Sequence, residues 1–426
     1  MKHYRNIILI LIITAISLSA CENQDGHHTH SLINLDHLKH LYAEVELKNG
    51  MELGAINIYS EYPDYIYAIE PDEGFSCVDD VARALVFLSA HTNNGDDPKI
   101  EMMIDKMTGF ILNMQADNGY FYNFLWGDMS INKTYRTSVA EANWWSWRAL
   151  WALGKIHPEL NGDLADRAKS AADLLIETIK NEYLELPNDT IMFEGMSLPN
   201  WFPCGTAYDQ ASVLMLGMES YYNNIQEDTA LIKLIEKFAE GLLLIQKGDR
   251  INFPYGAYLS WNKLWHSYGN MQAYAMLRAG QLLERDDFIE SALIEINYFY
   301  PYLINEGYLH HMYITEDEGQ ILETEKSMYP QIAYGIRPMV FACLEAYNVT
   351  HDKKYVDMAQ QAASWLAGNN PAAQQMYDPE SGRCFDGIGP EKEVNKNSGA
   401  ESTIEALLIL QAINNHPVAD INMIYE

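Results

Sequence analysis

Six stretches of the sequence repeat one local pattern, at intervals that few folds produce. In each stretch a serine or threonine precedes a helix rich in Ala, Leu and Met, and an acid or its replacement stands three positions after the hydroxyl residue. The six pairs are Ser76/Asp79, Ser138/Glu141, Thr206/Asp209, Ser267/Asn270, Ser327/Pro330 and Ser398/Glu401. Their hydroxyl residues are separated by 62, 68, 61, 60 and 71 residues. Periods of this length normally indicate helical arrays or closed toroids.

We expect these hydroxyls to cap helices. In a capping box the hydroxyl accepts a hydrogen bond from a free backbone N–H, and the acid three residues later returns the bond. Proline near a helix start is tolerated because an N–H at that position has no partner anyway. Apolar residues that recur at three and four also predict a second helix in each interval, at 99–115, 163–180, 229–246, 286–300 and 352–368.

The number of helices favours a closed ring. The sixth capped helix, 399–413, has no good partner after it, and the helix-like segment 31–44 could supply one. Twelve helices then make an all-α (α/α)6 toroid over residues 31–426, with short strands in loops near 118–124 and 308–314. An open solenoid is the alternative, but six repeats and a twelfth helix from the N-terminus match a ring better.

The N-terminus has the features of an export signal. Lys2 and Arg5 precede an apolar run, residues 7–20, which is too short to span a bilayer. The run ends in LSAC, which resembles the lipobox of bacterial lipoproteins. That resemblance implies that residues 1–20 are a signal peptide and that the thiol of Cys21 carries a lipid. We therefore expect an exported protein, anchored in a bacterial cell envelope at the outer membrane.

Residues 21–30 are predicted to be a flexible tether. The histidines in this segment could bind a metal, but a solvated spacer is the simpler interpretation; they are His27, His28 and His30. We predict no metal site and no cofactor. The cysteines after Cys21 fit no zinc-binding spacing, and their pairing does not follow from the sequence.

The net charge of −31 limits the partners. A strongly acidic surface repels phosphate backbones, so nucleic acid is not expected as a partner. Polymers rich in uronates are disfavoured for the same reason, whereas neutral sugars remain open. The oligomeric state does not follow from the sequence.

Acidic residues stand where the inner helices of the predicted ring begin. Asp79 and Asp80 begin one such helix, and Glu401 begins the last one. The N-termini of the inner helices gather at one mouth of a toroid, so these carboxylates are expected to meet there. Glu401 heads an apolar stripe with Ile404 and Leu408, and partial desolvation there raises the pKa of a carboxyl group. Plain capping is the alternative role for Asp79 and Glu401.

Short motifs support a resemblance to known enzymes. From about residue 70 the chain resembles the six-hairpin glycosidases, the superfamily of (α/α)6 glycoside hydrolases. WLAGNNP (365–371) and the late acid before an apolar helix are similar to family nine cellulases, in which an early Asp pair includes the base and a C-terminal Glu is the acid. VDDVARAL and WRALWALG look like helical domains found beside bacterial sugar-processing enzymes.

The resemblance implies an inverting glycoside hydrolase with two carboxylates. Asp80 would deprotonate the attacking water, Asp79 would orient it, and Glu401 would protonate the leaving oxygen, with Asp209 and Glu141 as reserves. The chain departs from the cellulase pattern because CVDD stands in place of Asp-Ala-Gly-Asp, which leaves the identity of the base open.

Aromatic residues make up 12% of the chain, and aromatic rings can stack on the C–H faces of sugars. Four tryptophans in predicted loops and four residues near inner helix starts are the candidates for sugar contacts. They are Trp126, Trp201, Trp261 and Trp265, and Tyr208, His266, Tyr268 and Tyr329. A second group of tryptophans falls inside a predicted helix and is assigned mainly to the core: Trp144, Trp145, Trp147 and Trp151.

Four further functions remain open. A polysaccharide lyase can use the same toroid, with a Tyr or His base and cationic groups drawn from His266, Tyr268, Arg136 and Arg337, although the 28 Lys and Arg residues are few for that chemistry. A non-catalytic glycan-binding lipoprotein also fits aromatic loops. The sequence does not exclude an epimerase or a phosphorylase. A phosphate-binding P-loop, an H-E-x-x-H motif and a G-x-S-x-G motif are all absent.

Overall fold

The computed structural model of the chain describes residues 32–91 and 97–425. The predicted signal peptide (1–20), the tether (21–30) with its histidines, and Cys21 lie outside these residues. The description that follows concerns the unit that begins at Leu32. None of the helices in the described ranges is both long and apolar enough to cross a bilayer.

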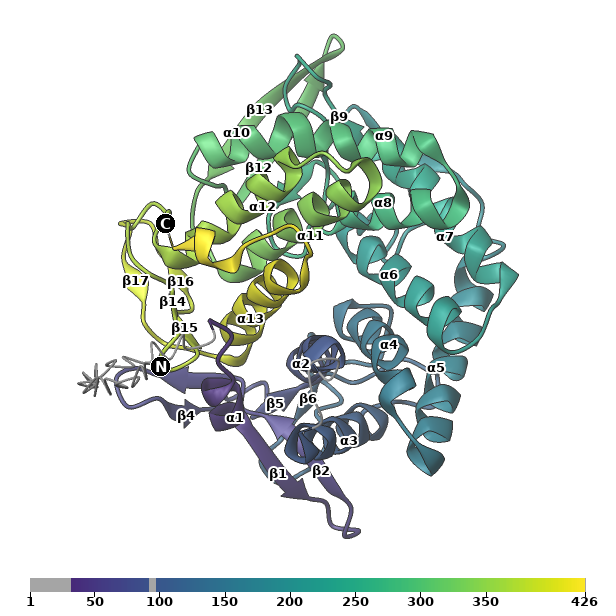
Figure 1. Cartoon of the computed structure of the whole chain (residues 1–426). Helices are drawn as coiled ribbons and strands as arrows, with labels where there is room; N and C mark the ends of the chain where they lie inside the picture. The colour runs from purple at the N-terminus through teal and green to yellow at the C-terminus, as the bar shows by residue number, and fades with distance from the viewer. Residues whose placement is uncertain (1–31, 92–96, 426) are drawn as a thin grey trace, which may run out of the picture. The chain divides into compact units, whose positions relative to one another are not determined.

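Six helices form an inner ring. They are α2 (Val78–His91), α4 (Trp144–Ile156), α6 (Tyr208–Asn224), α8 (Gln272–Leu283), α11 (Ala333–Thr350) and α13 (Ala400–Asn415). Each packs against the next in this order, and α13 packs back against α2, as Figure 1 shows. The ring is therefore closed, and the alternative of an open solenoid is wrong.

A second layer of helices covers the ring from outside. Its members are α3 (Pro98–Asn113), α5 (Gly162–Tyr183), α7 (Thr229–Ile245), α9 (Asp286–Ile294) and α12 (Lys354–Ala363). A π-helical turn, Glu295–Phe299, joins α9 to α10 (Tyr300–Asn305), and short 3₁₀ turns occupy His157–Glu159, Ser364–Ala367 and Ile421–Ile424. These bounds agree with the five predicted second helices, so the prediction of an (α/α)6 fold is confirmed.

The predicted twelfth helix, 31–44, is wrong over most of its length. Only α1 (Asp36–Leu41) is helical, and the chain then forms β1 (Tyr42–Glu46), which pairs with β2 (Glu52–Ile56). The turn between these strands contains Asn49-Gly50, a dipeptide that favours tight hairpins. α1 nevertheless lies against α13, so the N-terminal segment does cover the last inner helix.

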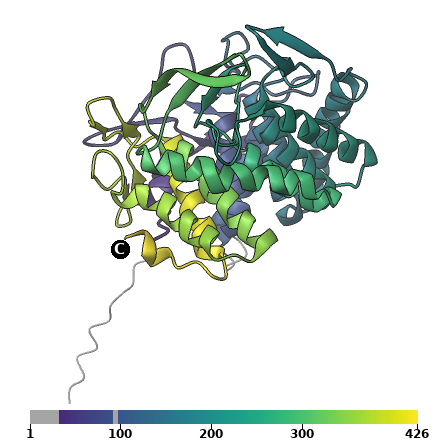
Figure 2. The same cartoon turned by 90° about the horizontal axis from the view of Figure 1, so that it is seen from above.

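Short strands gather at one end of the helices (Figure 2). The largest sheet has three strands, β11 (Leu264–His266), β12 (His311–Asp317) and β13 (Gln320–Ser327), in that order. The other pairs are β3 (Tyr59–Glu61) with β4 (Ile66–Ala68), β5 (Ser76–Cys77) with β6 (Phe124–Leu125), β7 (Thr190–Phe193) with β8 (Met196–Pro199), β9 (Gln246–Lys247) with β10 (Ala257–Tyr258), β14 (Tyr377–Asp378) with β15 (Arg383–Cys384), and β16 (Gly387–Ile388) with β17 (Val394–Asn395). Strands do occur at or near both predicted positions, as β6 and β12.

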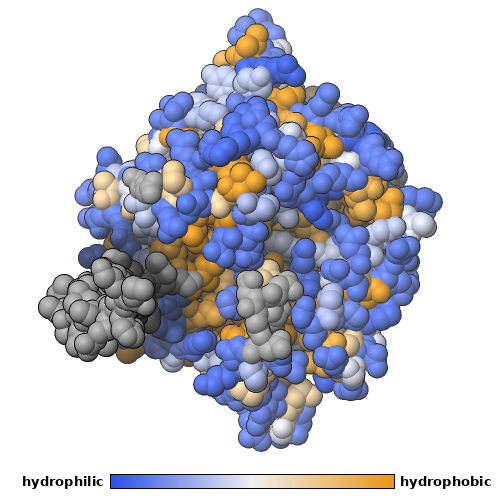
Figure 3. Space-filling model, viewed as in Figure 1, coloured by the Kyte–Doolittle hydropathy of each residue, from blue (hydrophilic) through white to orange (hydrophobic). Residues whose placement is uncertain are grey.

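The two layers differ in how their side chains are buried. Every residue of α6 from Tyr208 to Tyr221 is buried, as expected for a helix with neighbours on all sides. α5 instead has a single buried stripe, which includes Ala168, Leu175 and Ile179, and exposes the opposite face. Figure 3 views the ring from the end opposite to the strands, where apolar side chains are visible between the hydrophilic outer helices.

The predicted capping boxes do not form. Asn143 caps α4, and the residues that precede α6, α8, α11 and α13 make no side-chain capping bond. The hydroxyl of Ser138 accepts hydrogen bonds from the backbone N–H groups of a neighbouring strand segment, and Ser76 accepts one from Ile56 N–H. The serines therefore hold the loops before the helices, and the acids that follow them are free for other contacts.

All four cysteines of the described residues are free: Cys77, Cys204, Cys343 and Cys384.

The close approach of α4 to α6 can be tested at Gly154. A Cβ atom on this residue would lie 2.8 Å from Ser220 Cβ and 2.9 Å from the Ser220 carbonyl carbon, so a shift of one helix is required. We expect Gly154→Ala to lower the free energy of unfolding by about 1–3 kcal/mol. Gly127→Ala is the matched control, because nothing lies within 4 Å of its Cβ position. Equal urea midpoints for the two variants would contradict this account of the packing.

Candidate active site

A pocket of about 510 Å³ opens where α2, α4 and α13 begin, at the end of the ring that carries the strands. We call it the acid pocket. Its charged and aromatic lining comprises Tyr59, Glu73, Asp79, Asp80, Arg83, Phe124, Trp144, Trp145, Arg148, His266, Tyr268, Tyr334 and Glu401. The structure thus brings together Asp79, Asp80 and Glu401, as the sequence led us to expect.

Arg83 lies at the centre of this pocket and binds three carboxylates. Its Nη1 is 2.8 Å from Asp80 Oδ1, its Nη2 is 2.8 Å from Glu401 Oε2, and its Nε is 3.1 Å from Glu405 Oε1. The guanidinium is buried, and its planar fork suits several carboxylates at once. Arg83 stands on α2, whereas Glu401 and Glu405 stand on α13, so these contacts also join the two ends of the ring.

Glu405 is buried completely beneath the pocket. Its second oxygen binds Arg337 Nε, and Arg337 is buried as well. A further pair, Arg148 with Asp79, completes the group. Three arginines therefore face four carboxylates, Asp79, Asp80, Glu401 and Glu405, so the group is electrically balanced when one carboxyl group is protonated.

Of these four carboxyl groups, Glu401 is the most exposed to the pocket, and its pKa is raised. Burial, the largest effect, raises the pKa of Glu401 above its ordinary value, Arg83 lowers it, and the carboxylates of Asp80 and Glu405 raise it again. The side chain still exposes 41% of its surface. That surface faces the confined pocket, where less water can solvate the charge than in bulk solution, so desolvation still acts on this carboxyl group.

Asp80 is closed to the pocket although it lies in its wall. Its side chain exposes only 3% of its surface, and both oxygens have partners: Oδ1 binds Arg83, and Oδ2 accepts a hydrogen bond from the thiol of Cys77 at 3.1 Å. Burial raises the pKa of Asp80, and the charge of Arg83 opposes that shift. The expected role of Asp80 as the base on water is therefore not the role that this geometry favours.

Asp79 is the more accessible aspartate, with 19% of its side chain exposed. Arg148 binds its Oδ1, and Asn123 donates to its Oδ2 at 3.2 Å. The second Nη of Arg148 donates to the hydroxyl of Tyr334, and the guanidinium lies over the ring of Trp144 at 5.0 Å. Asp79 is thus held in one orientation at the pocket wall, beside a permanent positive charge.

His266 and Asp209 form a second polar pair. His266 Nε2 is 2.8 Å from Asp209 Oδ2, and Asp209 is buried while His266 is partly exposed in the acid pocket. Among the described residues, His266 Nδ1 has no hydrogen-bond partner. Asp209, predicted as a reserve catalytic residue, can therefore reach a ligand only through His266. Glu141, the other reserve, is exposed outside the pocket, where its carboxylate accepts a hydrogen bond from Asn143.

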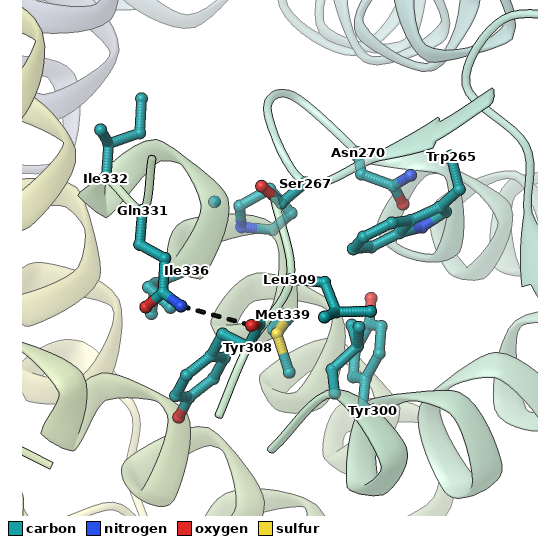
Figure 4. A pocket seen from close by; sticks show the side chains of 13 residues that line it. Trp265, Ser267, Asn270, Tyr300, Tyr308, Leu309, Gln331, Ile332, Ile336 and Met339 are labelled. Atoms are coloured by element: carbon teal, nitrogen blue, oxygen red, sulfur yellow. Dashed lines mark hydrogen bonds between the residues drawn. The ribbon is translucent and has the colours of Figure 1, made fainter. Parts of the chain in front are cut away.

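Three of the aromatic residues predicted to contact a sugar are buried, so the prediction is wrong for them. Trp201 stacks on Phe202 and donates to a backbone carbonyl of α7, and Tyr208 is fully buried at the start of α6. Trp265 lies beside Asn270 in an internal cavity of about 20 Å³, which has room for a single water molecule (Figure 4). These large rings fill the space under the loops, which sequence position alone does not distinguish from exposure.

The remaining aromatic candidates divide into two groups. His266 and Tyr268 do line the acid pocket, whereas the half-buried Trp126 and Tyr329 lie outside its lining. Trp261 is exposed and lines a separate groove on the same end of the ring.

Sequence reasoning missed Glu405, Tyr334 and the position of Trp144 in the pocket. Glu405 stands between Ile404 and Ala406 in an otherwise apolar segment, and an acid in such a position signals a buried ion pair. No group of three or more His, Cys, Asp or Glu residues within 32–91 and 97–425 is arranged to hold a metal ion.

Neither a protein family nor a curated protein matches the amino-acid sequence. Solved structures do match its fold. A sugar epimerase from a ruminal bacterium has 13% identity and a TM-score of 0.62, over 86% of this chain and 93% of that one. Cellobiose 2-epimerase from Spirochaeta thermophila has 12% identity and a TM-score of 0.58, over 88% and 92%. A D-mannose isomerase has 11% identity and a TM-score of 0.55, over 81% and 92%.

These likenesses show that the chain has an (α/α)6 toroid fold. At 11–13% identity they identify the fold and leave the reaction open.

The structural role of Glu405 predicts a large effect on stability. Glu405→Gln would leave Arg337 without its carboxylate partner in a buried site, and we expect a loss of about 3–5 kcal/mol in the free energy of unfolding. Glu401→Gln on the same helix is the control, and a loss of about 1 kcal/mol or less is expected because that carboxylate is partly exposed. Urea denaturation at pH 7 gives both values, and similar losses would show that Glu405 does not anchor the arginines.

Proposed function

We propose that the chain is a carbohydrate-active enzyme, a glycoside hydrolase that cleaves neutral oligo- or polysaccharides in the acid pocket. One observation carries the proposal: the Glu401 carboxyl group, whose pKa is raised, opens into the same pocket as the arginine-bound carboxylate of Asp79. Glycoside hydrolysis needs such a pair, with one carboxyl group protonated and the other ionised.

In this mechanism Glu401 donates its proton to the glycosidic oxygen while the bond from that oxygen to the anomeric carbon breaks. A water molecule attacks the anomeric carbon from the opposite face, and Asp79 accepts a proton from it, which inverts the configuration. Arg83 stabilises Glu401 after it has lost its proton. Asp80 and Glu405 do not contact the substrate, and they position Arg83.

The pocket lining supports a sugar as the substrate. Trp144, Tyr268 and Tyr334 offer ring faces to the C–H groups of a pyranose, and the charged groups around them can bind hydroxyls. The similar folds include proteins named as a sugar epimerase, a cellobiose 2-epimerase and a mannose isomerase. A neutral sugar fits best because every arginine of the network is already paired with a carboxylate and the net charge of −31 opposes an anionic substrate.

The experiment is a panel of plant, fungal and host glycans, with the products separated by chromatography. We expect Glu401→Gln and Asp79→Asn to lower kcat/KM by about 100- to 10,000-fold, the range for loss of a general acid or base. Glu141→Gln is the control, since Glu141 lies outside the pocket, and it should retain the activity of the wild type. Full activity of Glu401→Gln would overturn the proposal.

The pH profile tests the same assignment. A general acid acts only while it is protonated, so activity is lost as the pH rises through the pKa of Glu401. Because burial raises that pKa, the alkaline limb should lie above pH 4.5, the ordinary pKa of a glutamate side chain. An alkaline limb at or below pH 4.5 would contradict the assignment.

A sugar epimerase or isomerase is the second candidate, favoured by the His266–Asp209 pair. A histidine oriented by a buried carboxylate, with its other nitrogen free, can remove a proton from the carbon next to a sugar carbonyl. In D₂O such a reaction forms a C–D bond in the product, whereas hydrolysis forms none. We expect His266→Ala to abolish an epimerisation and to retain hydrolysis in part, and mass spectrometry of the products measures which occurs.

The same glycan panel would reveal a lyase or a non-catalytic binding protein. A lyase would release an unsaturated uronide that absorbs ultraviolet light, and a binding protein would retain glycans without any product.

We also propose, on the sequence alone, that the mature chain is exported and held in a bacterial cell envelope by a lipid on Cys21.

A further inference from the structure

Aromatic rings continue outward from the acid pocket in an unbroken row. The ring of Tyr268, in the pocket, lies 4.8 Å from that of His310, which lies 4.8 Å from that of His311. The ring of His311 lies 5.8 Å from that of Tyr313. We call these four residues and Trp261 the aromatic track. Its members stand on or beside β11 and β12, at the rim of the ring that Figure 2 shows.

The strand geometry turns the outer part of the track toward solvent. His311 and Tyr313 lie two positions apart on β12 and therefore share a face, while Met312 and Ile314 on the other face are buried. The pairing of β12 with β13 is irregular between Tyr313 and Ile314, and such bulges re-aim side chains. β11 pairs His266 with His311 and Leu264 with Tyr313, so it connects the pocket to the outer groove.

A second groove, of about 650 Å³, receives the outer end of the track. Its lining includes Trp261, Tyr313, Asn262, Lys263, Glu194 and Glu325. Trp261 exposes 41% and Tyr313 exposes 40% of their surfaces.

The backbone under these two rings is fixed. Trp261 exchanges two hydrogen bonds with Leu264, at 3.1 and 2.8 Å, and Tyr313 is part of a three-stranded sheet. A backbone that is already ordered loses little further conformational entropy when a ligand binds, and the apolar area that the two rings expose favours their being covered.

We propose that the aromatic track is an extended binding site for a neutral glycan chain whose reacting sugar lies in the acid pocket. The proposal rests on the proposed function for the occupant of the pocket. Sugars of the chain contact the exposed rings of the track, and Asn262 and Lys263 reach their hydroxyls in the outer groove. The substrate is therefore a chain of several sugars. Lys263 is paired with Glu194 at 2.8 Å, and Glu325 lies 3.4 Å from His311, so the groove offers no unpaired cation to a uronate.

Binding tests the track without any need for turnover. Affinity electrophoresis measures retardation of the protein in gels that contain soluble mixed-linkage glucan, xyloglucan, galactomannan or starch. We expect the wild type to be retarded by at least one of these polymers, and the double variant Trp261→Ala/Tyr313→Ala to bind it about tenfold more weakly. Tyr298→Ala is the matched control: Tyr298 exposes 38% of its surface on the remote π-helical turn and should bind as the wild type does.

Two results would overturn the proposal that the aromatic track binds a glycan chain. One is a wild type that binds none of the four polymers, and the other is a double variant that binds as tightly as the Tyr298→Ala control. The thermal midpoints of the variants verify that all of them are folded.

The length of the substrate distinguishes a loss of binding on the aromatic track from a loss of the chemistry in the acid pocket. With an active enzyme, the double variant should lower kcat/KM about tenfold on long oligosaccharides and leave it unchanged on a disaccharide. An equal loss at every chain length would overturn the track while hydrolysis stands. Conversely, the wild type could bind a polymer through Trp261 and Tyr313 and yet cleave no glycan. That result would support the aromatic track as a binding site and overturn the proposed hydrolase activity.

Discussion

The guanidinium of Arg83 binds carboxylates from two helices that stand near opposite ends of the sequence, Asp80 on α2 and Glu401 and Glu405 on α13. A buried cation is tolerated only when its partners are held in good geometry, because desolvation of the charge costs several kcal/mol. Glu405 is one of these partners, and its other carboxylate oxygen is held in turn by the buried Arg337. The position of Glu401 at the pocket follows from this cation, whereas the raised pKa of Glu401 is caused mainly by burial, which the charge of Arg83 opposes.

The network under the pocket is not the most stable way to fill that space. Apolar residues of similar volume often stabilise a core as well as a buried ion pair or better. Three arginines and four carboxylates at one mouth of the ring are therefore better explained by the chemistry that we propose than by stability. The same low dielectric environment that makes the network costly also strengthens each interaction with a polar ligand.

Much of the fold could be predicted because hairpin repeats leave a regular spacing in the sequence. The inner and outer helices and the meeting of Asp79, Asp80 and Glu401 all follow from that spacing. The capping boxes failed for a physical reason: the loops before the helices fold into short strands, and the serine hydroxyls bond to those strands instead. The likeness to family nine cellulases stays a prediction.

Contacts between side chains were harder to predict than helices. A tryptophan in a loop is equally compatible with exposure and burial until the packing of neighbouring elements is known, which is why Trp261 and Trp265 have opposite environments. The division of roles between Asp79 and Asp80 depends on which neighbour each carboxylate finds. Both carboxylate oxygens of Asp80 are bonded, one to Cys77 and one to Arg83. Asp79, the residue before it on the same helix, is more exposed and lines the pocket.

The packing of α13 on α2 has a consequence for how the protein matures. Arg83 and Glu401 are 318 positions apart in the chain, and they meet only when α13 packs on α2. The acid pocket is therefore incomplete until this last inner helix has packed. A nascent chain that still lacks α13 can form the earlier hairpins, but its Arg83 then lacks Glu401 and Glu405 and keeps only Asp80 as a partner. Assembly of the acid pocket and completion of the ring are therefore the same event.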